Sequence, residues 1–263
     1  MYLAEKLAEF SKEWKAREDL NVRARNMLRI DNEVKNLQSF ANRAYSTEMA
    51  TQKTVIRDLL GGEYLFIQFG VFSSLSYSCS NEKRNTGTHS LMHQEEMESC
   101  VDSTVARVRA MAVTWDDILA RSVWCQAVGS LVDTLATKVI SDVMDMSSIG
   151  QDEAYNIANL IAKVTELDDL FLPSKLSGRE AESSAGEVAL TAQYAPSWLR
   201  LQYLSEVLQS NLNEVRYLWF ESELSLYFSA EEVVDLVNAS FEVNARSREV
   251  IREIGERPHP RVE

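Results

Sequence analysis

The stretch VDSTVARVRAMAVTWDDILARSVWCQAVGSLVDTLATKVISDV, residues 101–143, decides the fold class. Apolar and small residues recur in it every three or four positions, which places them on one face of an α-helix. These residues are Val101, Val105, Val108, Met111, Trp115, Ile118, Ser122, Cys125, Gly129, Val132, Ala136, Val139 and Val143. The spacing predicts either one kinked helix or two stacked helices, and Thr114 with Asp117 could cap a break between them. Small residues at Ser122, Gly129 and Ala136 would let a partner helix come close.

The same periodicity continues on both sides of this stretch. It predicts helices over 2–17, over about 21–60 and over 157–171. Proline disrupts helix interiors, and residues 1–172 contain none, so long helices are permitted there. We therefore expect an all-α protein in which residues 1–172 form an elongated stack, or rod, of long antiparallel helices.

A smaller helical domain is predicted at the C-terminal end. Residues 173–190 are rich in Ser, Gly and charge, which is typical of a linker. Over 191–256 we expect two helices, one beginning near Pro196 and running past Trp219, the other beginning at the capping box of Ser229 and Glu232. Residues 257–263 read as a disordered tail.

Residues 63–89 fit none of this pattern. The apolar run from Tyr64 to Phe72 could form a buried strand, but a lone strand has nothing to pair with. The segment is either an irregular insertion or intron sequence carried into the reading frame. The second interpretation arises because codons for Gly62-Glu63-Tyr64 can match a splice-donor consensus.

The charge and cysteine content limit the function classes. Acidic residues outnumber basic ones by 40 to 27, which argues against nucleic-acid binding because a phosphate backbone attracts a basic face. The three cysteines, Cys79, Cys100 and Cys125, form no CxxC motif and cannot all pair, which suits a reducing compartment.

Export and membrane insertion are not expected. Glu5, Lys6 and Glu9 lie where a signal peptide needs an apolar core. The longest apolar stretch, residues 64–79, is shorter than the roughly 20 residues of a membrane helix. We expect a soluble, cytoplasmic protein whose membrane contacts are peripheral and made through partners.

The sequence contains no motif that indicates catalysis, a cofactor or a metal. Phosphate-loop, dinucleotide-binding and nucleophile-elbow patterns are absent. His89, His93 and Cys100 could share a helix face as a zinc trio, but Ser90 stands where a metalloprotease would carry its glutamate. We favour a solvated helix end for these residues.

The adjacent acids Glu95, Glu96 and Glu98 read as a solvated helix face rather than an acid–base site. Acid–base chemistry needs carboxylates held in different environments within one pocket. We therefore expect a protein that is not an enzyme and that binds no cofactor or metal.

An aromatic cluster is the candidate partner-docking surface. It consists of Tyr217, Trp219, Phe220, Tyr227 and Phe228 around one short helix connection. Five aromatics exceed what a small helical hairpin can bury, so both core packing and partner contact stay open for each of them.

The segment from Ala195 to Ile254 resembles the C-terminal end of the Zeste-white ten family. That family has a tryptophan after a proline, then a leucine-rich helix whose middle reads close to L-x-S-x-L-x-E-I. A phenylalanine–serine start to the final helix follows, with an aromatic, asparagine and arginine pattern beyond it. The matching residues here are Pro196, Trp198, the run LQSNLNEV at 208–215, Phe228, Ser229, Phe241, Asn244, Arg246 and Arg248.

The resemblance implies a scaffold of the helical-rod tethering group. Such proteins belong to a complex that captures Golgi-to-ER retrograde vesicles at the endoplasmic reticulum and assists SNARE assembly. Their C-terminal part docks on a large solenoid subunit. In some lineages the same protein joins Rod and Zwilch at kinetochores to recruit dynein in the mitotic checkpoint, and the sequence does not separate these roles.

Family members are far longer than this sequence, which lacks the half that binds the sister tethering subunit. A chain of this length is expected to dock on the solenoid without bridging to that subunit, and a truncated reading frame stays open. The alternative from another class is a self-associating coiled-coil or spectrin-like structural protein, which would also explain the helical periodicity.

Overall fold

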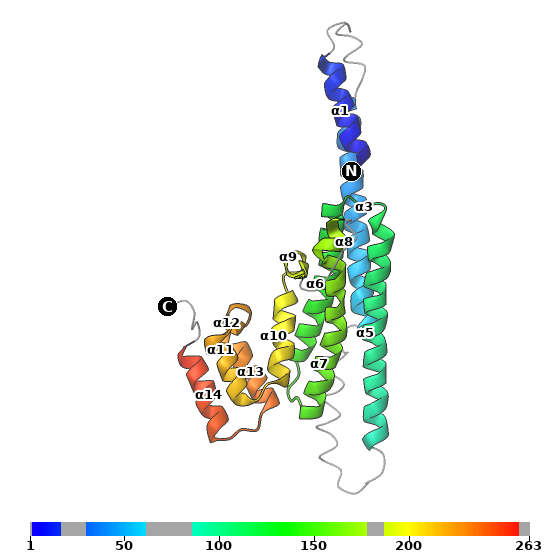
Figure 1. Cartoon of the computed structure of the whole chain (residues 1–263). Coiled ribbons are helices and arrows are strands. Elements are labelled where there is room, and N and C mark those ends of the chain that lie inside the picture. Colours follow the sequence, from blue (N-terminus) through cyan, green and yellow to red (C-terminus); the bar gives the residue numbers. More distant parts are fainter. Residues whose placement is uncertain (1, 17–29, 62–85, 178–186, 258–263) are drawn as a thin grey trace. The chain divides into compact units, whose positions relative to one another are not determined.

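The computed structural model describes residues 2–16, 30–61, 86–177 and 187–257, and every regular element within these ranges is a helix (Figure 1). This confirms the all-α prediction for the described part of the chain. None of the described helices is both long and apolar enough to cross a membrane.

The chain divides into two compact units, residues 1–54 and 55–263. The first unit contains α1 (Tyr2–Ala16) and most of α3 (Ile30–Leu59). These helices confirm the predictions for 2–17 and, from residue 30 onward, for 21–60. Residues 17–29 and 62–85, and with them most of the predicted 63–89 insertion, lie outside the described residues.

The second unit is built around an antiparallel helical bundle. It consists of α5 (Thr86–Asp116), α6 (Arg121–Met144), α7 (Gln151–Thr165) and α10 (Trp198–Gln209), with α6 and α7 packed on both α5 and α10 (Figure 1). The break after Asp116 selects the two-helix interpretation of residues 101–143. The indole N–H of Trp124 fastens the corner by donating to the carbonyl of Ala112 at 2.7 Å.

The segment before α10 closes one end of the bundle. It includes the 3₁₀ helix η1 (Glu166–Phe171) and the short helices α8 (Pro173–Ser177) and α9 (Thr191–Tyr194). The ring of Tyr194 stacks on Phe171 at 5.8 Å between centroids. The Cβ and the backbone carbonyl of Tyr194 lie directly over Gly129 of α6. Gly129 therefore lets α9 pack closely on α6, and close packing at this position is what the small residue in the sequence predicts.

The predicted linker over 173–190 stays a prediction. Residues 173–177 form α8, and residues 178–186 lie outside the described part. After them, the Leu190 N–H donates a hydrogen bond to the Phe171 carbonyl at 3.0 Å. The following helices α9 and α10 pack on α6, so this part of the predicted 191–256 domain is continuous with the bundle.

The two long C-terminal helices of the prediction are each divided, which is a correction. The first becomes α10 and α11 (Leu212–Glu221), and the second becomes α13 (Ala230–Ser240) and α14 (Ala245–Glu256), with α12 (Leu224–Tyr227) between the pairs. Asn211 and Asn244 cause the breaks, because each side chain accepts hydrogen bonds from the first N–H groups of the helix that follows it. The apolar period runs through both breaks, so periodicity alone predicts continuous helices.

Candidate functional site

The candidate site lies on the C-terminal helices α10 to α14, which carry the predicted docking aromatics. Three of these helices begin in capping boxes, at Asn211, Ser229 and Asn244. Such boxes satisfy N–H groups that a short helix otherwise leaves without partners. The local sequence thereby fixes where each helix starts, and so how the aromatic side chains are presented.

A charged contact joins these helices to the bundle. The guanidinium of Arg200 on α10 pairs with the carboxylate of Glu232 on α13 at 2.6 Å and lies 4.7 Å above the ring of Phe228. A backbone hydrogen bond from Ile149 to Ala239, 2.8 Å long, adds a second link. Helix α13, and through it the last helices of the chain, is thus anchored to α10 and to the loop between α6 and α7.

Glu232 is held ionised by this arrangement. Partial burial acts to raise the pKa of its carboxyl, but the hydrogen bond with the Ser229 N–H and the charge of Arg200 outweigh burial, and the pKa lies below its ordinary value. The negative charge of Glu232 therefore serves both the helix cap and the ion pair.

Two of the five predicted docking aromatics belong to the core. Trp219 is fully buried and its indole N–H donates to the carbonyl of Arg257 at 3.1 Å, which ties α11 to the end of α14. Phe228 is 3% exposed and lies under Arg200. Neither ring can meet a partner unless the helices come apart.

Two more are half-buried and have partners within the chain. Tyr227 stacks on Tyr203 of α10 with ring centroids 5.2 Å apart. Phe220 lies under the guanidinium of Arg216, 5.6 Å from its centroid. These rings can contribute an edge to a partner surface while they hold the helices together.

Tyr217 is the aromatic of this group that faces solvent. Its side chain is 62% exposed and, within the described residues, makes no side-chain hydrogen bond, ring stacking or cation–π contact. Leu226, at 59% exposure, is the large apolar residue exposed on α12. Of the five aromatics predicted to dock, Tyr217 is thus exposed, Phe220 and Tyr227 are half-buried, and Trp219 and Phe228 are buried.

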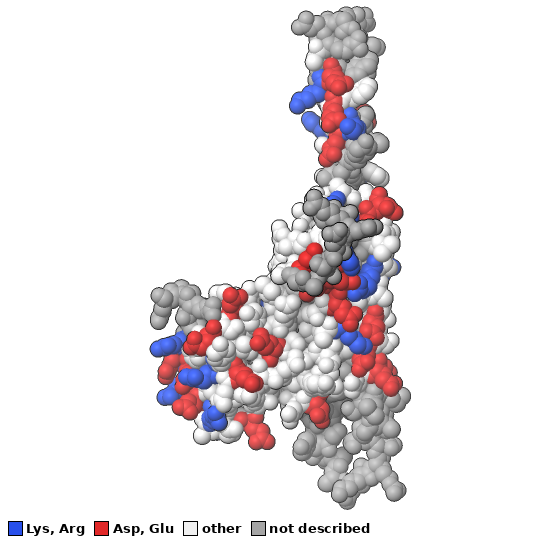
Figure 2. Space-filling view, in the orientation of Figure 1, with Lys and Arg blue, Asp and Glu red and all other residues white. Residues whose placement is uncertain are grey.

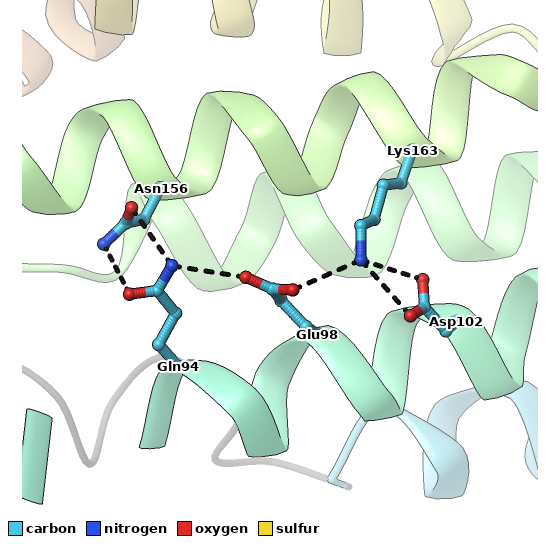
Figure 3. Close-up of polar contacts among 5 residues, drawn as sticks. All are labelled: Gln94, Glu98, Asp102, Asn156 and Lys163. Atoms are coloured by element: carbon cyan, nitrogen blue, oxygen red, sulfur yellow. Dashed lines mark hydrogen bonds and ion pairs between the residues drawn. The ribbon is translucent and has the colours of Figure 1, made fainter. Parts of the chain in front are cut away.

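A polar ladder between α5 and α7 is a feature that the sequence analysis missed (Figure 3). Lys163 of α7 reaches Asp102 at 3.1 Å and Glu98 at 3.4 Å on α5, and the amides of Gln94 and Asn156 exchange hydrogen bonds one turn farther along. Pairs between helices leave no local sequence signal, unlike pairs within one helix. The ladder includes Glu98, one of the three acids read as a solvated face.

The other groups singled out for chemistry form no reactive arrangement in the described residues. The side chains of His89 and His93 lie outside the described part, and Cys100 is half-buried on α5. Within the described ranges no cluster of three or more His, Cys, Asp or Glu side chains could hold a metal ion.

Buried titratable groups serve packing. Burial raises the pKa of the Cys125 thiol, which disfavours the reactive thiolate. Burial likewise raises the pKa of Asp142, although Lys138 on the same helix offsets part of this at 2.6 Å. The carboxyl of Asp168 also has a raised pKa from burial and accepts a hydrogen bond from Thr191, which fastens α9 to η1.

Comparison with known proteins gives one family and several distant relatives. Residues 99–254 match the family model described as the ZW10 C-terminal helical domain. The match begins within α5 and ends within α14, so it includes most of the bundle and the candidate site.

The curated relatives include three that carry the name centromere/kinetochore protein zw10 homolog. The mouse (Mus musculus) protein is 25% identical over 170 residues, which are 62% of this chain and 21% of that protein. The rat (Rattus norvegicus) protein is 24% identical over 170 residues, and the Caenorhabditis elegans protein 22% over 164. This chain spans about a fifth of the length of the curated relatives it matches.

Proposed function

This chain belongs to the Zeste-white ten (ZW10) family, and from that premise we propose that it is a non-enzymatic scaffold subunit of a membrane-tethering complex. It docks through its C-terminal helices on a solenoid subunit and acts in Golgi-to-ER retrograde vesicle transport. It works in the cytoplasm, peripheral at the endoplasmic reticulum membrane, and contacts SNAREs only through its partners.

The observation that carries this proposal is the extent of the family match, which runs from α5 into α14. The resemblance at residues 195–254 implies that this part of such proteins docks on the solenoid. The exposed Tyr217 and Leu226 supply apolar contact area in the same helices. Docking requires neither a cofactor nor a metal.

A second candidate function is a kinetochore subunit of the Rod–Zwilch type, active in the mitotic checkpoint and dynein recruitment. The observation that favours it is the name of the mouse, rat and nematode relatives, which describes centromere or kinetochore proteins. Both functions use the same kind of docking, so they differ in where and when the complex forms.

The test is to express the tagged chain at native level, capture it with bound proteins and image it through the cell cycle. Tethering predicts that the solenoid subunit is captured in interphase, that the tag lies at the endoplasmic reticulum, and that depletion slows retrograde cargo return. The kinetochore role predicts a signal at centromeres in mitosis and loss of dynein there on depletion. Capture of the chain with only its own copies would contradict both and favour a self-associating structural protein.

A further inference from the structure

Helix α13 is joined to the rest of the chain near both of its ends. Near its beginning, Glu232 pairs with Arg200 of α10 at 2.6 Å, and the same guanidinium lies over the ring of Phe228. Near its end, the carbonyl of Ala239 accepts a hydrogen bond from the N–H of Ile149, in the loop between α6 and α7. These two contacts are about two helical turns apart along α13.

A cavity of about 280 Å³ opens where α6, α10 and α13 meet. Its lining is mostly polar and includes Thr137 and Ser141 of α6, its cap Asp145, Arg200 of α10, its cap Ser197, and Glu232 of α13. A space of this size and polarity admits water. Beside the ion pair, α13 is therefore not held against α6 by close apolar packing, and the pair spans the gap between α10 and α13.

Helices α11, α13 and α14, here called the C-terminal group, have contacts of their own that do not involve the bundle. The indole N–H of Trp219 on α11 donates to the carbonyl of Arg257 at the end of α14, Arg216 of α11 pairs with Glu253 of α14, and α13 packs on α14. On the side seen in Figure 2, charged side chains gather on these last helices and are sparse where the helices meet the bundle. The three helices can thus move together without losing the contacts that hold them to one another.

Helix α12 connects the C-terminal group to α10. It packs on both α10 and α11, its residue Tyr227 stacks on Tyr203 of α10, and Leu224 is fully buried. The chain itself passes from α10 to α11 through Ser210 and Asn211, which lie outside both helices. The contact of α12 with α10 consists of rings and apolar side chains, so it does not depend on the Arg200–Glu232 pair.

We infer that the C-terminal group swings as a rigid body on α12, and that the Arg200–Glu232 pair holds the group closed against α6. Breaking the pair lets α13 move away from α6 and widens the cavity, while the hydrogen bonds inside each helix stay in place. Because the two side chains are 31% and 34% exposed, the strength of the pair falls as salt is added. This conformational device involves no partner, so its test is independent of the proposed docking function.

The amide of Ile149 reports the motion, because its hydrogen-bond acceptor lies on α13 about two turns away from the ion pair. Hydrogen exchange of the purified whole chain, followed residue by residue by NMR, measures how often this bond opens. Arg200→Ala is expected to raise the Ile149 exchange rate by up to about fivefold, as the loss of a partly exposed ion pair allows. Amides inside α13 and α14 that are bonded within their own helix should keep their wild-type rates.

Arg109→Ala is the matched control, since Arg109 forms a similar ion pair with Asp169 at 2.9 Å, with side chains 35% and 39% exposed. It should leave the Ile149 rate unchanged. Glu232→Gln should raise that rate as Arg200→Ala does, and it supplies the test if Arg200→Ala does not fold. The double variant should exchange no faster than Arg200→Ala alone, because both substitutions remove the same ion pair.

Three results would overturn the inference. An Ile149 rate that neither Arg200→Ala nor Glu232→Gln changes would show that the ion pair does not hold the group closed. A rise of equal size for the amides inside α13 would show that the helix unfolds locally and does not swing. An equal rise in Arg109→Ala would show a general loosening of the fold that has nothing to do with α13.

Discussion

Trp219 and Tyr217 lie two residues apart on one helix and have opposite roles. The Trp219 ring fills the space between α11 and α14 and its indole hydrogen bond closes the end of that pair. The Tyr217 ring projects to solvent. Since both are aromatic residues in one cluster, the difference arises from the angle that each takes around the helix axis.

Replacing each of these residues by alanine should therefore separate stability from docking. Trp219→Ala should lower the free energy of unfolding by about 3–5 kcal/mol, because it leaves a cavity in the core. Tyr217→Ala should change it by no more than about 0.5 kcal/mol. Urea denaturation followed by circular dichroism measures both, and equal losses in the two variants would show that the burial assigned here is wrong.

Gly129 is required by a close contact rather than by its backbone conformation. A Cβ atom placed there would lie 2.4 Å from the Cβ of Tyr194 and 2.7 Å from the Tyr194 carbonyl oxygen. Both atoms belong to or sit next to the backbone of α9, so they cannot rotate away. Gly255 of α14 has no such neighbour within 4 Å.

Alanine at these two glycines should have effects of opposite sign. Glycine to alanine in a free helix position gains up to about 1 kcal/mol, and Gly255→Ala should stabilise the protein by that amount or less. Gly129→Ala should instead cost about 1–3 kcal/mol, because α9 must shift away from α6. Thermal melts of both variants measure this, and a rise in melting temperature for Gly129→Ala would contradict the close contact.

At the scale of elements, the Arg200–Glu232 pair links the bundle to α13. Because the pKa of Glu232 lies below its ordinary value in the folded state, its contribution to stability is present above that ordinary value. The contribution is lost as pH falls through the folded pKa. The link between α10 and α13 should therefore weaken in acid.

Glu232→Gln isolates this contribution, since glutamine can keep the capping box while it removes the charge. At neutral pH the variant should be less stable than the wild type by about 1 kcal/mol or less, as expected for a partly exposed pair. The difference should shrink as the pH falls below the ordinary range of a glutamate. A difference that stays constant from neutral to acidic pH would show that the charge of Glu232 does not stabilise the fold.

Periodicity alone predicts most of the described helices, including α1, α5 and α6, because a helix with one buried face repeats apolar residues every three or four positions. It fails at Asn211 and Asn244, where a cap breaks the chain without interrupting the apolar repeat. It also cannot reveal the ladder of Lys163 with Glu98 and Asp102, since its members lie about 60 residues apart in sequence.

The candidate site could be located from sequence but not resolved into its parts. Aromatic density marked residues 217–228, yet which rings are buried depends on how α11, α12 and α14 pack together. Trp219 and Phe228 proved to be core, and Tyr217 proved to be exposed. Burial of this kind is a property of the assembled helices and has no local signature.

At the scale of the whole molecule, the family match extends over both the bundle and the helices that we propose dock on a partner, residues 99–254. The chain spans about a fifth of the length of its curated relatives. The net charge of −13 agrees with a partner that offers a basic surface. The function proposed here therefore depends on one interface, formed by the C-terminal helices.

The most direct test of docking is the mass of the complex between this chain and the solenoid subunit, measured by light scattering during gel filtration. Docking predicts a stable one-to-one complex, heavier than the solenoid subunit by one chain of 29.8 kDa. Elution of the chain alone, or as an oligomer of itself beside free solenoid subunit, would contradict the docking function and leave the family membership and helical fold as the secure conclusions.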